Sequence, residues 1–243
     1  MWLQLSETKG SNTSKYPDYR DYPGGVEYFD VYSPLIVQRY SQVYWKALPP
    51  VNLPDEIRTK FDGRTMAFVG FEIDQVQNPT VPAAGGSSAP GSQDVSVPIN
   101  VVYNHHFEST MSGKAARFEK VALKPGETPQ DHGGHGAPNT KETWVVKPVD
   151  EAVGLSATSR ASFGGANGGE YRKSFHGYPP GNAQLLDSPQ AFTITPMQID
   201  TWNREKMPMW NLTHGPKFVP GPVSPQAVCL LLVMYVHFLR DCL

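Results

Sequence analysis

The sequence contains little cysteine and no excess of charge of either sign. Its two cysteines, Cys229 and Cys242, both stand near the C-terminus of the 243-residue chain. The rest of the chain can therefore form neither a disulfide framework nor a cysteine-ligated zinc site. Lysine and arginine number 21 against 23 aspartate and glutamate, for a formal net charge of -2. Because there is no basic field, nucleic acid is not an expected partner.

Targeting signals and the motifs of several enzyme classes are also missing. The N-terminal MWLQLSETKG has neither a basic stretch nor an apolar run of signal-peptide length. The compartment stays open: the secretory pathway if an upstream signal peptide is missing from this sequence, and the cytoplasm otherwise. In the secretory pathway Asn12 and Asn211, each in an Asn-x-Ser/Thr sequon, would make the chain a glycoprotein. No G-x-S-x-G, Walker A or H-E-x-x-H motif occurs.

Glycine and proline are abundant and indicate many short elements separated by loops. The chain has 22 glycines and 23 prolines, whereas average proteins hold roughly 12% of the two together. Acidic residues after Pro54 and the stop at Asp62-Gly63 predict a short helix. Alternating or apolar segments predict strands at 65–73, 95–103, 116–123, 143–149 and 190–199. We expect an all-β fold: an antiparallel, jelly-roll-like β-sandwich with long Gly/Pro-rich loops.

The pattern divides the chain into four segments. Residues 1–64 are expected to be an irregular segment packed on the domain, 65–200 the β-sandwich, and 201–226 a Pro-rich loop. The tail, 227–243, changes abruptly to an apolar composition, and its run at 227–239 is shorter than the roughly 20 residues that span a bilayer. Three interpretations stay open for this apolar helix: a membrane-associated helix, a sequence foreign to the domain, or a buried terminal helix.

The residues that could carry chemistry are mainly histidines. His105 and His106 end an alternating strand, and only a bulge or strand terminus there can turn both side chains toward one metal ion. Imidazole pairs suit copper or zinc but require a third ligand from elsewhere. His132 and His135, in a glycine-rich loop, and His176, among aromatic residues, could supply it.

Each of these histidines also has an ordinary structural interpretation. His105 and His106 can be one core and one surface residue, His132 and His135 part of a solvated loop, and His176 a packed, hydrogen-bonded side chain. Methionine thioethers could likewise bind copper(I), although methionine more often fills gaps in a core. The methionines considered are Met197, Met207 and Met209.

A family resemblance rests on two motifs within residues 65–200. A strand running into Asn104-His105-His106, followed by Gly169-Glu170-Tyr171-Arg172, resembles the copper type II, ascorbate-dependent monooxygenases and the related stress up-regulated Nod19-type proteins. The resemblance implies a jelly-roll domain that holds copper through imidazoles. In that family a second domain with a His-x-His pair and a methionine completes a two-copper hydroxylase, and this chain has no clear His-x-His pair.

Three functions follow from these observations. The first is a copper-binding domain, part of a monooxygenase-like protein, that uses His105 and His106 with His176 or the His132/His135 pair; zinc is the alternative metal. The second is a metal-free β-sandwich that binds an unknown ligand or partner through exposed aromatic side chains. The third is an inactive, truncated gene product whose tail packs against nothing. The substrate and the oligomeric state are unknown.

Overall fold

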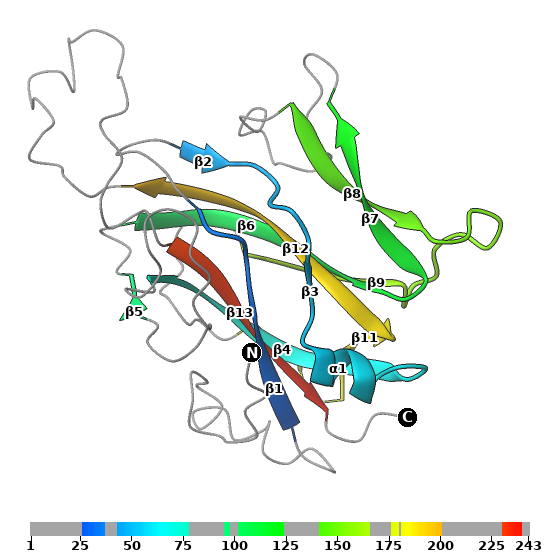
Figure 1. Cartoon of the computed structure of the whole chain (residues 1–243). Helices are drawn as coiled ribbons and strands as arrows, with labels where there is room; N and C mark the ends of the chain where they lie inside the picture. The colour runs from blue at the N-terminus through cyan, green and yellow to red at the C-terminus, as the bar shows by residue number, and fades with distance from the viewer. Residues whose placement is uncertain are drawn as a thin grey trace, which may run out of the picture.

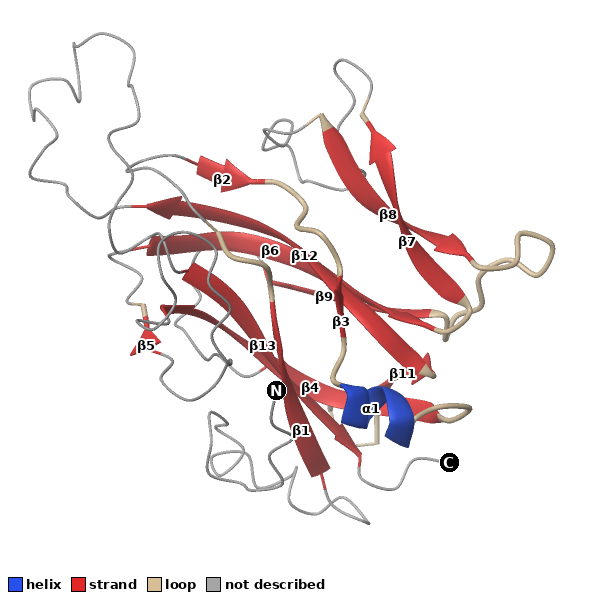
Figure 2. Ribbon diagram, viewed as in Figure 1, coloured by secondary structure: helices blue, strands red, loops and turns tan. Residues whose placement is uncertain are grey.

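The structure is a computed structural model that describes residues 26–36, 43–77, 95–97, 102–123, 141–165, 176–179, 181–200 and 230–239. It consists mostly of antiparallel β-sheets with one short helix, which confirms the expected all-β character (Figures 1 and 2). Within the described part of the chain, none of the helical structure has the length and apolar character needed to cross a membrane.

The strands form two large sheets and a hairpin. The first sheet has the order β1-β13-β4-β10, with β5 and β11 also paired to β4. Its strands are β1 (Val26–Tyr32), β4 (Thr65–Gln77), β5 (Val95–Ser96), β10 (His176–Gly177), β11 (Gln184–Asp187) and β13 (Leu230–Leu239). The second sheet has the order β2-β12-β6-β9, with β3 paired to β12. It comprises β2 (Val43–Trp45), β3 (Val51–Asn52), β6 (Val102–Gly113), β9 (Arg160–Gly165) and β12 (Pro189–Asp200).

The short helix forms where the sequence predicts it. Helix α1 spans Asp55–Lys60, directly after Pro54, with acidic residues in its first turn and basic residues in its last. This charge order complements the helix dipole. Ile57 is buried and belongs to the hydrophobic core, and it anchors the helix there.

The apolar helix expected at the C-terminus is wrong over residues 230–239, which form strand β13. This strand pairs antiparallel with β1 on one side and with β4 on the other, and it lies between them in Figure 1. A continuous apolar run of this length is typical of a strand buried within a sheet, and periodicity alone does not distinguish it from a buried helix. The expectation that the tail packs against nothing is also wrong for residues 230–239.

The two large sheets share one hydrophobic core. Phe71 of β4 packs edge-on against Phe163 of β9 and Phe107 of β6, with ring centroids 5.2 and 6.4 Å apart. Phe238 of β13 contacts Phe29 and Phe61, which links the C-terminal strand to β1 and to the end of the helix. Edge-to-face aromatic pairs add to the stabilisation from buried area.

Strand β4 differs from the one-sided strand that its alternating sequence predicts. Every residue from Met66 to Val76 is buried, including Glu72 and Asp74, which are 0% and 2% exposed. Because β4 pairs with β13 and also with β5, β10 and β11, it is an inner strand of the sheet. The burial of consecutive residues shows that both of its faces are covered. The strand expected over 95–103 is described only in part, as β5 and the first residues of β6.

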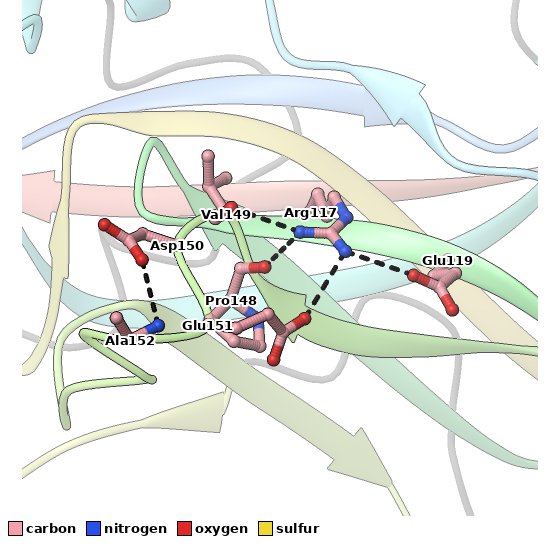
Figure 3. A network of polar contacts seen from close by, with 7 residues as sticks. All are labelled: Arg117, Glu119, Pro148, Val149, Asp150, Glu151 and Ala152. Carbon is pink, nitrogen blue, oxygen red and sulfur yellow. Dashed lines mark hydrogen bonds and ion pairs between the residues drawn. The ribbon is translucent and has the colours of Figure 1, made fainter.

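A separate hairpin projects beside the second sheet. Strands β7 (Ala116–Ala122) and β8 (Glu142–Pro148) form close to the predicted positions 116–123 and 143–149. Among the described residues they pair only with each other. At its base Arg117 donates to the carbonyls of Pro148 and Val149 and forms ion pairs with Glu119 and Glu151 (Figure 3). This network fixes the chain where it leaves β8.

A core substitution in β13 tests whether the C-terminal strand belongs to the folded domain. Phe238 is 0% exposed, so Phe238→Ala should lower the free energy of unfolding by about 3–5 kcal/mol through lost burial and cavity formation. Val153, which is 80% exposed, serves as the control. Val153→Ala should change the free energy of unfolding by less than about 0.5 kcal/mol. Urea unfolding of the full chain measures both. Equal midpoints for the two variants would contradict the placement of β13.

Candidate metal centre

A β-bulge in β6 places His105 and His106 next to each other on the second sheet. In the ladder with β12, Met197 lies opposite His106 and Gln198 lies opposite Asn104, so His105 is the inserted residue of the bulge. A bulge bends the strand and redirects the side chains on either side of it. The two imidazole ring centroids are 5.3 Å apart, with the rings tilted by 46°. The bulge thus lies at the position where the sequence required an interruption of the strand for both side chains to turn to one side.

The pair has an aromatic and partly polar environment. The Tyr103 hydroxyl and Nδ1 of His105 form a hydrogen bond of 3.2 Å. The ring of Trp45, on β2, meets His106 edge-on with centroids 5.9 Å apart. Nε2 of His106 is shielded from solvent, and Trp45 is 3% exposed. The Tyr103 hydroxyl thus orients the imidazole of His105, and the Trp45 indole packs edge-on against the imidazole of His106.

Behind the bulge, polar side chains enter the space between the sheets. Gln75 of β4 donates from Nε2 to Oε1 of Gln198 at 2.7 Å, and Gln198 is 0% exposed. Asn104, opposite Gln198, is 7% exposed, and its buried Oδ1 has no hydrogen-bond partner among the described residues. These amides face the core, whereas His106 lies on the opposite face of the same sheet with Trp45.

His176 does not join the pair. It lies on β10 in the first sheet, opposite Phe71 in the ladder, and its ring is stacked on Phe71 at 4.9 Å with an interplanar angle of 9°. In the described part of the chain, no three side chains of His, Cys, Asp or Glu come close enough to hold one metal ion. His132 and His135 lie outside the described residues. The ligand set expected from His105, His106 and His176 is therefore not assembled.

Tyr103 and Trp45 were not among the candidate site residues predicted from the sequence, and no sequence pattern distinguishes Met197 from the other methionines. Tyr103 precedes His105 by two residues, a spacing that places side chains on one face of a strand and could have indicated the contact. Trp45 and Met197 are far from the histidines in the sequence, and only the pairing of β2, β12 and β6 brings them to the same place.

Comparison with known proteins gives no family for the chain. It matches no protein-family model, and no curated protein matches it either.

Tyr44, on the core side of the second sheet, has a raised pKa. Burial raises the pKa of the Tyr44 hydroxyl from 10.0 to about 12. Tyr44 is 5% exposed, lies opposite Gln198, and has the Lys46 ammonium 5.0 Å from its ring centroid. The neutral phenol is favoured because an ionised one would lose its hydration.

This shift predicts a loss of stability in alkali. The unfolded chain releases the Tyr44 proton at about pH 10, whereas the folded chain holds it to about pH 12. The contribution of neutral, buried Tyr44 to the free energy of unfolding is therefore complete below pH 10 and decreases as the pH rises toward 12. Tyr44→Phe should make the urea midpoint less dependent on pH between 10 and 12. Parallel midpoint curves for the two proteins would show that Tyr44 ionises equally in both states.

Proposed function

We propose that this chain binds copper through His105 and His106, with zinc as the alternative metal. The observation that carries the proposal is the bulge at His105, which sets the two ring centroids 5.3 Å apart. Two imidazoles on one tetrahedral ion have centroids about 5 Å apart, because each metal–nitrogen bond is about 2.0–2.1 Å long. The spacing of the two rings is therefore close to that of two imidazoles that share an ion.

The hydrogen bond to Tyr103 supports a defined role for each nitrogen of His105. A metal-ligating histidine usually donates its other ring N–H to an oxygen, which fixes its tautomer. In the metal-bound state, Nδ1–H of His105 donates to the Tyr103 oxygen and Nε2 binds the ion. Tyr103 is then a positioning residue, because it orients the ligand without touching the metal.

We also propose a jelly-roll-like fold and a monooxygenase-type activity. The two antiparallel sheets and their common core favour a jelly-roll-like β-sandwich. Within such a domain, a copper ion with an open coordination position would support an oxidoreductase of the monooxygenase type. This part of the proposal depends on the resemblance of the Asn104-His105-His106 segment to that family.

The metal-free binding module finds less support among the described residues. That function predicts exposed aromatic side chains gathered on one face. The large apolar side chains that are exposed in the described part of the chain are aliphatic: Val43, Val149, Val153, Leu155 and Leu185. The aromatic rings around the bulge are instead engaged with histidines.

Metal content of the full chain tests the proposal. Every sample should carry Cys229→Ser and Cys242→Ser, because thiolates bind copper and zinc strongly. After reconstitution and desalting, elemental mass spectrometry should find about one equivalent of copper per chain, and His105→Ala/His106→Ala should remove it since two ligands are lost. His176→Ala is the matched control and should retain the metal, because His176 lies in the other sheet. A folded parent without copper, or a double variant that keeps it, would refute the proposal.

A second variant tests whether the glycine-rich loop contributes a ligand. If His132 or His135 coordinates the ion, then His132→Ala/His135→Ala should weaken copper binding by at least ~10-fold, as loss of one ligand does. Competition with a chromophoric chelator measures this change. Unchanged affinity would show that neither loop histidine is a ligand.

A further inference from the structure

Strand β7 is an edge strand of the projecting hairpin. Among the described residues its only strand partner is β8, in a sheet of two strands. At the end of this ladder Leu123 donates its backbone N–H to Lys141 at 2.8 Å, so the odd-numbered residues of β7 bond to β8. In an antiparallel pair, the residues between them direct their N–H and C=O groups to the opposite side. The backbone groups that point to the outer edge are those of Ala116, Phe118, Lys120 and Ala122.

Such an edge can accept a further strand, because its outward N–H and C=O groups are a template for pairing. A hairpin of two strands is marginally stable by itself and gains stability from additional strands. A second copy of this chain supplies an identical edge. Two identical strands related by a two-fold axis pair antiparallel, and the residue at the centre then lies opposite its own equivalent.

The charges on β7 select one centre for this pairing. With Phe118 at the centre, Arg117 lies opposite Glu119 of the second copy, and Glu119 lies opposite Arg117 of that copy. Both pairs have opposite charges, which stabilises directly opposed residues. A centre at Arg117, Glu119 or Lys120 would instead oppose two like charges. The edge of β8 has no such complementarity, because Glu142 and Lys147 are five residues apart and point to opposite faces.

The same register continues an apolar row across the hairpin. Phe118 lies opposite Val146 of β8, and both side chains are half-buried. In the paired state Phe118 would also lie opposite Phe118 of the second copy. The row would then run through four strands with two phenylalanines at its centre, and aromatic pairs opposed across strands are favourable.

The two charged residues are accessible to a second copy. Arg117 and Glu119 have side chains that are 43% and 44% exposed. The Nη atoms of Arg117 bond to the carbonyls of Pro148 and Val149 and to the carboxylates of Glu119 and Glu151 (Figure 3). Its Nε–H takes no part in these contacts and can donate to a further carboxylate.

We propose that β7 pairs antiparallel with β7 of a second copy of this chain, centred on Phe118, so that the two hairpins form one four-stranded sheet. Arg117 and Glu119 set the register through two reciprocal ion pairs. The contact lies on the hairpin and does not use the histidine pair of β6, so it is independent of the proposed metal binding.

Sedimentation of the full chain tests this inference. Both cysteines are replaced by serine and a chelator is present, so that neither a disulfide nor a metal joins two copies. The mean mass should rise with concentration from 26.8 kDa toward twice that value. Arg117→Glu and Glu119→Arg should each weaken association at least ~10-fold, since two attractive pairs become repulsive.

A mixture of the two charge variants gives the sharpest result. Arg117→Glu carries two glutamates and Glu119→Arg two arginines at these positions, so a mixed pair has opposite charges at both contacts. The equimolar mixture should therefore associate as tightly as the parent, although neither variant does so alone. Folded variants that fail to associate when mixed would overturn the proposed register.

A backbone variant tests the edge itself. The N–H of Lys120 points away from β8, so Lys120→Pro keeps the hairpin ladder but removes a donor to the second copy. It should weaken association at least ~10-fold, whereas Lys120→Ala, which keeps the N–H, should associate as the parent does. Circular dichroism and urea midpoints verify the fold of each variant. A parent that stays at 26.8 kDa up to its solubility limit, or Lys120→Pro that associates normally, would refute the pairing.

Discussion

The antiparallel pairing of β6 with β12 is the constraint on which the candidate metal centre depends. The ladder runs from Gly113 opposite Pro189 to Val102 opposite Asp200, and its register shifts near Pro189 and again beside Met197, where His105 is the extra residue. Because side chains alternate between faces, a shift of one residue reverses which of them face the core. The bulge absorbs that shift at His105, so Phe107 and Asn104 both remain on the core side while His106 faces outward beside Trp45.

The common core holds this ladder in place. Phe107 follows His106 directly, is 1% exposed, and packs edge-on against Phe71 of the other sheet. Phe71 belongs to β4, and β4 pairs along most of its length with the C-terminal strand β13. Burial of these aromatic side chains is the main stabilising term. The contact of Phe107 with Phe71 and the pairing of β4 with β13 therefore connect the strand that carries the histidine pair to the C-terminal strand β13.

Much of the local structure was predictable, because it depends on neighbouring residues. The helix after Pro54 and the strands at 116–122 and 142–148 form close to the positions that their periodicity and turn residues indicate. The need for a bulge at His105 followed from the alternation of side chains in a strand. The run at 230–239 was misassigned because a continuous apolar segment lacks a period, and only its pairing with β1 and β4 decides that it is a strand.

The sequence by itself determined that the chain is mainly β-structure and that its two thiols stand near the C-terminus, and it predicted His105 and His106 as a metal-binding pair. The tertiary structure alone decided which residues surround them: Trp45 and Met197 lie beside His106, and His176 stacks on Phe71 in the other sheet. The physical reason is that alternation and turn propensity act over a few residues. Strand order and register are instead set by pairing and core packing between segments far apart in the chain.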